Sequence, residues 1–259
     1  PDQGWFLIGK DWKDLYETEI VLYSVQKGKM TQEAEFIIPR EWIVSELSLV
    51  KGIDQKLYIL HSNSFIQFDP KTKSSQVFSL DQFNWRGPIV FNLVQTIDGT
   101  FWAGTSNGLI KMTQTDQGFD FQLIEGLRNP ICASLLVDPI DGHILWVGTK
   151  GGGLHRLDTK TMDIQNLNVK NGLPNDVIYG VLNDDQGNLC LSSNKGLIRY
   201  NPSSGKIRNF TAADGLQSDE FNTYAYGKGP DGTLYFGGIK GLNSFSPRDL
   251  QDNPNVPVV

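Results

Sequence analysis

The chain has 259 residues, a formal net charge of −6 at pH 7 and two cysteines. The acidic balance argues against the phosphate backbone of a nucleic acid or an anionic membrane surface as a partner. No stretch reaches the ~18 consecutive apolar residues that a membrane-spanning helix needs. Cys132 and Cys190 each lie in an apolar segment, so we expect two buried free thiols, which leave the redox compartment undefined.

Similar short segments recur along the chain. They are "QGWFLIG" from Gln3, "QKLYILHSNSFIQFDP" from Gln55, "DGTFWAGTSNGLIKM" from Asp98, "DGHILWVGTKGGGLHRLD" from Asp141, "QGNLCLSSNKGLIRYNP" from Gln186 and "DGTLYFGGIKGLNSFSP" from Asp231. If the second residue of each segment is used to measure the repeat length, the successive separations from Lys56 to Gly232 are 43, 43, 45 and 45 residues. A steady period in the low forties is typical of four-stranded propeller blades, and no helical periodicity lies within a period.

One period contains four predicted strands. From Val177 onward these are "VIYGVLND", "NLCLSS", "LIRYN" and "IRNFT", separated by the turns "DQG", "NKG" and "PSSGK". The strands are apolar on both faces, as in "TFWAG" at 101–105, whereas a sheet with one face in water would alternate apolar and polar residues. The sequence therefore predicts an all-β fold, a β-propeller of four-stranded blades stacked on both faces.

About six repeat units are visible, and the first and last are incomplete. The inner strands are expected near 43–50, 88–96, 131–137, 177–183 and 221–226. Residues 1–247 form the blades, and residues 248–259 read as a linker into a following domain. We expect a seven-bladed ring completed by residues outside this chain, because an open propeller would expose a sheet edge.

The repeats resemble the two-component regulator propeller repeat, which has a Gly-Leu-Pro loop, an inner strand, Asp/Gln-Gly-x-Leu-Trp-Ile-Gly, Asn-Gly-Leu and a strand ending in Asn-Pro or Asp-Pro. The matching positions are Gly172–Pro174, Gly187–Leu189, Asn194–Leu197 and Asn201–Pro202. "DGLQSDEFN" (214–222) and the strands after it resemble the last repeat before a tyrosine-rich immunoglobulin-like module, and "NVPVV" resembles the opening of that module. Cys190 departs from the usual Trp, and "HSNSF" (61–65) lacks the Gly-Leu.

This resemblance implies an extracytoplasmic segment of a sensor kinase, the periplasmic ectodomain of an inner-membrane protein. It implies recognition of an oligosaccharide or another small-molecule ligand, with the signal passed through the immunoglobulin-like module. Further propeller and immunoglobulin-like domains of the same chain are the implied partners, and a homodimer is left open. Nucleic acid, a membrane span in this segment and cofactors are not expected.

Two other classes of propeller stay open, a glycosidase or lyase and a protein-docking propeller. A sialidase-type repeat separates Asp from Gly by one residue, whereas Asp98, Asp141 and Asp231 are each followed directly by Gly, as in two-residue hairpin turns. The three histidines lack the spacing of metal ligands. The sequence therefore predicts no catalytic residue, no metal site and no enzyme activity in this segment.

A ligand is expected on the face where the joining loops between blades meet the second-to-third strand turns, the default concave site of such a fold. Sugars bind to polar side chains and flat aromatic rings. The candidate binding residues in these loops are Trp42, Trp85, Arg86, Arg128, Asn129, Asn175, Asp176, Asp219, Glu220 and Asn222. Gly87 and Pro88 fix the exit of the loop that carries Trp85 and Arg86, so this pair could present a rigid indole and guanidinium to a sugar ring.

Overall fold

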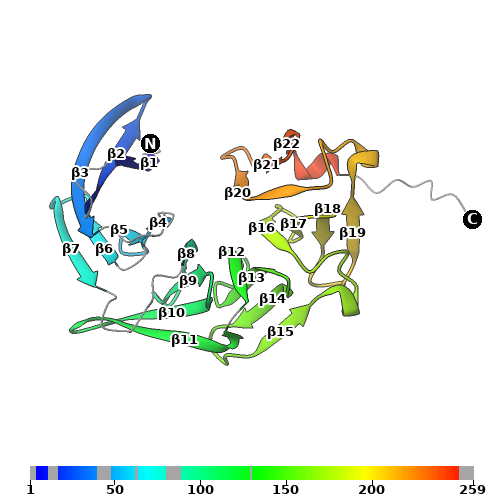
Figure 1. Ribbon diagram of the computed structural model, residues 1–259, viewed down its shortest axis with the longest axis horizontal. Helices are drawn as coiled ribbons and strands as arrows, with labels where there is room; N and C mark the ends of the chain where they lie inside the picture. The colour runs from blue at the N-terminus through cyan, green and yellow to red at the C-terminus, as the bar shows by residue number, and fades with distance from the viewer. Residues whose placement is uncertain are drawn as a thin grey trace, which may run out of the picture. The chain divides into compact units, whose positions relative to one another are not determined.

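The structure is a computed structural model that describes residues 4–10, 17–39, 48–61, 64–79, 89–128 and 130–250. The chain divides into two compact units, Pro1–Asn129 and Pro130–Val259. In each unit the strands form antiparallel sheets in which chain neighbours are hydrogen-bonded neighbours (Figure 1). This arrangement follows from the short turns between strands, since antiparallel pairs can be joined by a tight hairpin.

Unit 1 contains three sheets among its described residues. The first is three-stranded, with β1 (Gly4–Lys10), β2 (Glu17–Gln26) and β3 (Lys29–Pro39). The second is four-stranded, with β4 (Ser48–Lys51), β5 (Leu57–His61), β6 (Ser64–Asp69) and β7 (Ser74–Ser79). The third is four-stranded, with β8 (Val90–Gln95), β9 (Phe101–Thr105), β10 (Gly108–Thr115) and β11 (Gly118–Arg128).

Unit 2 also contains three sheets among its described residues. The first has β12 (Ile131–Val137), β13 (Ile144–Lys150), β14 (Gly153–Asp158) and β15 (Ile164–Leu167). The second has β16 (Ile178–Asn183), β17 (Leu189–Ser193), β18 (Gly196–Tyr200) and β19 (Ile207–Phe210). The third has β20 (Phe221–Lys228), β21 (Leu234–Gly238) and β22 (Gly241–Phe245). Single-turn 3-10 helices are η2 (Val169–Asn171), η3 (Ala212–Asp214) and η4 (Pro247–Asp249).

The all-β prediction and the four-stranded repeat are confirmed. The inner strands β8, β12, β16 and β20 begin within two residues of the predicted positions, and β4 lies at the end of the predicted 43–50 segment. No helix in the described part of the chain is long and apolar enough to cross a membrane. The number of blades in a complete ring and the linker at 248–259 stay predictions, and residues 251–259 lie outside the described ones.

The Asp side chains of the first-to-second strand turns have a structural role. Asp98 Oδ1 accepts a hydrogen bond from the backbone N–H of Thr100 at 3.1 Å. Asp141 and Asp231 accept the equivalent bonds from the residues two positions on. Such a bond stabilises a turn locally, which explains why Asp recurs there.

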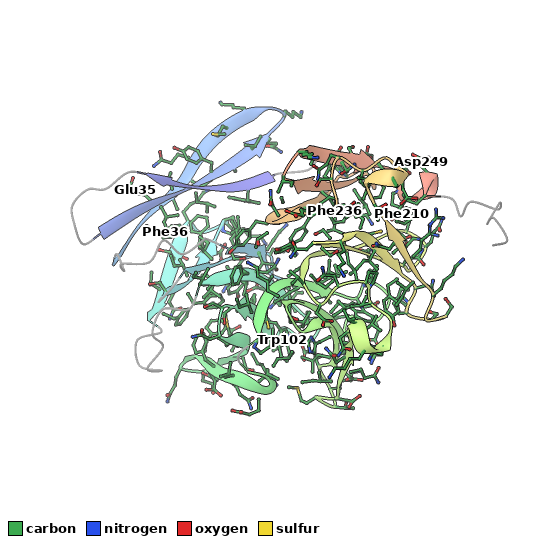
Figure 2. All side chains as sticks on the ribbon, turned by 45° about the vertical axis from the view of Figure 1, so that its right-hand side comes forward. Glu35, Phe36, Trp102, Phe210, Phe236 and Asp249 are labelled. Carbon is green, nitrogen blue, oxygen red and sulfur yellow. The ribbon has the colours of Figure 1, made fainter. Side chains whose placement is uncertain are left out.

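The core lies between neighbouring sheets within each unit, because both faces of the sheets are apolar. In unit 1, Tyr58, Phe65 and Phe101 join Phe119 in one aromatic cluster, with Phe65 and Phe119 centroids 4.7 Å apart. In unit 2, the second sheet packs on the first and on the third. Figure 2 shows Phe210 and Phe236, which belong to the hydrophobic cluster between the second and the third sheet of this unit.

Close packing of the sheets explains one glycine. A Cβ built on Gly148 of β13 would lie 2.8 Å from Cγ2 of Ile178, which is the first residue of β16 in the next sheet. The same two sheets are tied by a hydrogen bond of 2.9 Å from Val181 N–H to Ser134 Oγ. A larger residue at 148 would therefore force the sheets apart.

In three of the described sheets a large side chain occupies one equivalent position in the second strand, and its polar tip is hydrogen-bonded. Trp102 Nε1 donates to Thr96 Oγ1 at 3.1 Å. Trp146 Nε1 donates to Asp138 Oδ2 at 2.8 Å. Tyr58 fills the position in the second sheet of unit 1, where its hydroxyl donates to Asp54, and burial raises its pKa to about 12. Cys190 takes the place in the second sheet of unit 2.

Candidate ligand-binding face

In unit 2 the loop that joins β15 to β16 is fastened to the β13–β14 turn. The carbonyl oxygen of Asp176 accepts hydrogen bonds from the backbone N–H groups of Gly151 and Gly153, at 2.9 and 2.7 Å. Its side-chain Oδ1 accepts from Val169 N–H at 2.7 Å, at the start of η2. Asp176 therefore joins the two loops that the sequence placed on one face.

The same arrangement recurs one repeat later. The carbonyl oxygen of Asp219 accepts from Gly196 N–H in the β17–β18 turn at 2.7 Å. Its side-chain Oδ1 accepts from Ala212 N–H at the start of η3 at 2.6 Å. Joining loops and second-to-third strand turns thus share a face in this unit, which we call the loop face.

Side-chain amides complete these connections. Asn166 Nδ2 donates to Gly152 O at 2.7 Å, and Asn209 Nδ2, one repeat later, donates to Lys195 O at 2.9 Å. Gln217 connects the next joining loop to the third sheet, because its Oε1 accepts from Lys240 N–H at 2.8 Å. The loops are therefore held by side chains as well as by the backbone.

His155 belongs to this scaffold. Its Nε2 lies 2.7 Å from Asn166 Nδ2. Because Nδ2 is an amide donor, Nε2 acts as the acceptor and the imidazole is neutral. Burial lowers the pKa of His155 below its ordinary value of 6.5, which favours this neutral form.

The structure describes five of the ten predicted binding residues. Asn175 and Asp176 are half-buried, and the Asn175 side chain accepts from Val177 N–H at 2.8 Å. Asp219 and Glu220 are exposed in the joining loop, and Asn222 is exposed as the second residue of β20. Trp42, Trp85, Arg86 and Asn129 lie outside the described residues, and Arg128 is described only as the backbone end of β11.

The loop face offers carboxylates and amides on a fixed backbone. The Oδ1 atoms of Asp176 and Asp219 each accept a hydrogen bond from a backbone N–H of their own loop. The first role of these two side chains is therefore to shape the loop. The exposed carboxylate of Glu220 can accept hydrogen bonds from hydroxyl groups, and the exposed amide of Asn222 can both donate and accept. Asn166, Asn209 and Gln217 were not predicted as residues of the loop face, although Asn166 and Asn209 recur at a step of 43 residues.

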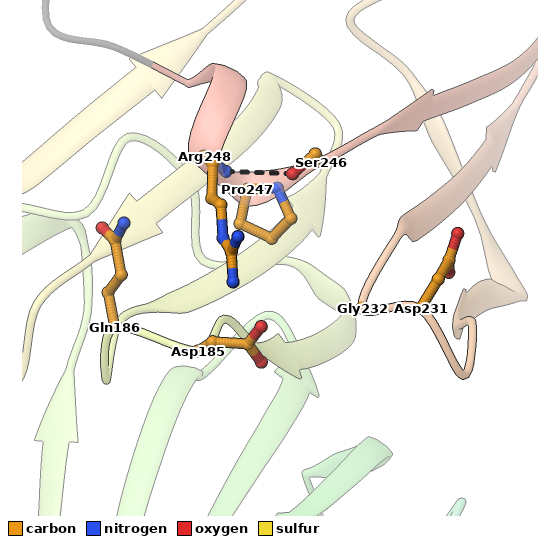
Figure 3. Close-up of a pocket in the computed structure, with 7 residues that line it drawn as sticks. All are labelled: Asp185, Gln186, Asp231, Gly232, Ser246, Pro247 and Arg248. Carbon is orange, nitrogen blue, oxygen red and sulfur yellow. Dashed lines mark hydrogen bonds between the residues drawn. The ribbon is translucent and has the colours of Figure 1, made fainter.

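A second candidate lies at the opposite end of the strands of unit 2. A cavity of about 110 Å³ is lined by Asp185, Gln186, Asp231, Gly232, Ser246, Pro247 and Arg248. Figure 3 shows the Arg248 side chain pointing towards Asp185, whose carboxylate pairs with Lys228 at 3.0 Å. Pockets that enclose drug-sized ligands have volumes of ~300–1,000 Å³, so this one is too small to enclose an oligosaccharide.

The His, Cys, Asp and Glu side chains of the described residues do not form a metal-binding cluster. Among the described residues between 4 and 250, no group of three or more His, Cys, Asp or Glu side chains could hold a metal ion. Cys132 and Cys190 are buried free thiols, as expected, and burial raises the pKa of each to about 12. Neither is therefore a thiolate near neutral pH.

Sequence comparison finds one informative relative, and no family model matches the chain. The chain is 33% identical over 171 residues to a protein named histidine kinase P4 from Formosa agariphila. The match covers 61% of this chain and only 12% of that kinase. The chain therefore corresponds to a small part of the relative.

Comparison with solved structures shows the fold. The extracellular domain of BT4673 from B. thetaiotaomicron, assigned to a hybrid two component system, matches with a TM-score of 0.64 at 16% identity. This match covers 92% of the chain and 32% of that domain. Virginiamycin B lyase from Staphylococcus aureus matches with a TM-score of 0.60 at 13% identity, over 93% of the chain and 88% of the lyase. At these identities the likeness shows a propeller-like fold and nothing of the function.

Proposed function

We propose that the chain is a ligand-sensing segment of a two-component sensor kinase, without catalytic activity of its own. The observation that carries the proposal is the 33% identity to a histidine kinase over 171 residues. The likeness to an extracellular domain of a hybrid two component system supports it at the level of the fold. The kinase activity would lie in other domains of the same protein.

The ligand we propose is an oligosaccharide, bound on the loop face. Sugar hydroxyls need several polar partners at fixed positions, and preorganised loops lower the entropic cost of binding. The backbone bonds of Asp176 and Asp219 give this rigidity in unit 2. Glu220 and Asn222 are the side chains of the loop face proposed to contact it. Trp85 and Arg86, which lie outside the described residues, stay a separate prediction for a joining loop of unit 1.

The proposed location is the periplasm, as part of an inner-membrane protein. An immunoglobulin-like module and further propellers of the same protein would carry the signal onward. The ligand would act by stabilising one arrangement of these domains over another, because binding shifts an equilibrium only through differential affinity.

The test is a binding measurement on the complete extracytoplasmic segment with a panel of oligosaccharides, by isothermal titration calorimetry. The double variant Glu220→Ala/Asn222→Ala should lose about 1–3 kcal/mol of binding free energy, since it removes two polar contacts. The matched control is Asp185→Ala/Gln186→Ala, which removes one acidic and one amide side chain at the opposite end of β16 and β17. Equal affinity in both double variants would refute the assignment of these two side chains.

A lyase-type activity is the second candidate function, because a lyase shares the fold with a TM-score of 0.60. The described residues of the loop face include no histidine other than the buried His155. A lyase needs a general base that reaches its substrate. Formation of cleaved products during the binding experiment would favour this candidate over sensing.

A further inference from the structure

The first strand of the third sheet of unit 2 carries an enlarged bulge at its loop-face end. Between two register pairs, Phe221–Gly238 and Tyr226–Phe236, β20 has four intervening residues and β21 has one. We call these four residues, 222–225, the β20 bulge. Because Gly238 is the last residue of β21, the bulge begins beside the β21–β22 turn. It therefore lies at the loop face.

Three other first strands bulge at the same place by a single residue. The strands β8, β12 and β16 each shift register once, and the extra residues are Phe91, Ala133 and Tyr179. The β20 bulge is longer, and it begins with two polar residues, Asn222 and Thr223. Bulges occur next to functional sites, where they change the direction of a side chain. The repeat itself therefore does not require the added residues of β20.

The β20 bulge contains a strained backbone conformation. Tyr224 has a φ of +63°. The other described residues with positive φ that are not glycine lie in connections between strands, and they are Lys27, Gln55, Lys73 and Met162. A bulky residue is an outlier in this region, which glycine occupies readily. Such strain persists only where the surrounding structure imposes it, and it is concentrated at functional sites.

Both ends of the β20 bulge are fixed by packing. Phe221 is buried in the cluster between the second and third sheets of unit 2, and the carbonyl oxygen of Glu220 accepts from Ile239 N–H at 3.2 Å. A Cβ built on Gly180 of β16 would lie 2.5 Å from Cγ of Tyr226, so this ring packs directly against the neighbouring sheet. The surrounding structure therefore imposes the path of the bulge.

The first two side chains of the β20 bulge can bind a ligand. Asn222 is exposed and Thr223 is half-buried, and neither side chain makes a hydrogen bond to another described residue. By contrast, the side chains of Gln217, Ser218 and Asp219 in the preceding loop each accept from a backbone N–H. The bulge therefore presents an amide and a hydroxyl group that do not hold the loop in place.

We propose that the β20 bulge determines specificity on the loop face, where Asn222 and Thr223 contact sugar hydroxyl groups. Tyr224 is a positioning residue, because its left-handed backbone sets the path that presents these two side chains. An amide and a hydroxyl both donate and accept hydrogen bonds, which suits neighbouring sugar hydroxyls. A fixed bulge also lowers the entropic cost of binding. This inference rests on the proposed function and names the segment that recognises the sugar.

The first test measures binding of cellohexaose, laminarihexaose, mannohexaose and xylohexaose to the complete extracytoplasmic segment by isothermal titration calorimetry. Asn222→Ala/Thr223→Val removes both polar contacts and should weaken binding at least about tenfold. The matched control is Thr113→Val/Gln114→Ala, which removes an exposed hydroxyl and an exposed amide at the end of β10 remote from the β9–β10 turn. It should bind as the unchanged protein does.

The second test separates the backbone of Tyr224 from its ring. Tyr224→Gly and Tyr224→Val both remove the ring, but glycine adopts a positive φ readily whereas a β-branched residue does not. Tyr224→Val should therefore bind at least about tenfold more weakly than Tyr224→Gly. A role of the ring in packing alone would give the two variants equal affinity. The first test decides the proposal even where Tyr224→Val does not fold.

The outcomes distinguish this inference from the proposed function. Full retention of oligosaccharide binding by Asn222→Ala/Thr223→Val, equal affinity of the two Tyr224 variants, or the same loss in the matched control would overturn the role of the β20 bulge and leave sensing intact. A lack of binding of all four oligosaccharides to the unchanged protein would overturn the proposed function, and this inference with it.

Discussion

Gly196 is the residue whose backbone is most tightly constrained in the β17–β18 turn. Its φ is +94°, and a Cβ there would lie 1.9 Å from the carbonyl oxygen of Phe210. Gly196→Ala should therefore lower the free energy of unfolding by more than about 2 kcal/mol, because it adds a clash to the cost of a left-handed L-residue. Denaturant unfolding measures this change.

The control for Gly196 is Gly205→Ala in the β18–β19 turn. Gly205 has a φ of +71° and no atom within 4 Å of a built Cβ. This variant should lose only the conformational term of about 1–2 kcal/mol. Equal losses at both positions would contradict the role given to the close approach to Phe210.

His155 makes unfolding depend on pH. Its folded pKa is lowered from 6.5 by burial, so the unfolded chain binds the proton more readily. Its contribution to stability is complete above pH 6.5 and is lost as the pH falls from about 6.5 to the lowered folded pKa. His155→Gln keeps an acceptor for Asn166 and should flatten the dependence of unfolding free energy on pH between 7 and 5. Equal slopes in the two proteins would contradict this assignment.

At the scale of single elements, the indole of β13 joins its strand to the turn before it. Trp146→Phe removes the 2.8 Å bond to Asp138 Oδ2 and leaves a smaller ring in a buried position. The loss should be about 1–3 kcal/mol of unfolding free energy, since a half-buried acceptor loses its donor. Asp138→Asn should also be destabilising, because Oδ1 accepts from the N–H groups of Ile140 and Asp141 and an amide leaves only one acceptor oxygen. Unchanged stability in both variants would contradict the account.

The strands were predictable from the sequence because their signals are local. Turn glycines and aspartates mark each hairpin, and β12 was predicted to the residue at Ile131–Val137. The cross-strand pair of Arg199 and Arg208 was not predictable, because the two residues meet only through the register that the β18–β19 turn sets. The departure at Cys190 was visible, but its consequence depends on where Asn188 and Arg199 lie in three dimensions.

At the scale of the whole molecule, the sequence predicted a propeller-like fold, and structural likeness supports that fold. The repeat also indicated that joining loops and second-to-third strand turns share a face, which the bonds from Gly151 and Gly196 confirm in unit 2. The sequence could not show that Asp176 and Asp219 shape this face. Their glycine partners lie in the β13–β14 and β17–β18 turns, and they meet these aspartates only in the folded chain. Their selection as binding residues rested on loop position and polarity alone.

The central claim is that the chain senses an oligosaccharide without transforming it. The most direct measurement incubates the purified extracytoplasmic segment with an oligosaccharide panel and analyses the bound and free sugars by mass spectrometry. The account predicts that at least one oligosaccharide is retained by the protein and recovered at its original mass, and that Glu220→Ala/Asn222→Ala lowers the retained amount. Recovery of cleaved or otherwise altered sugar, or retention of none of the panel, would contradict it.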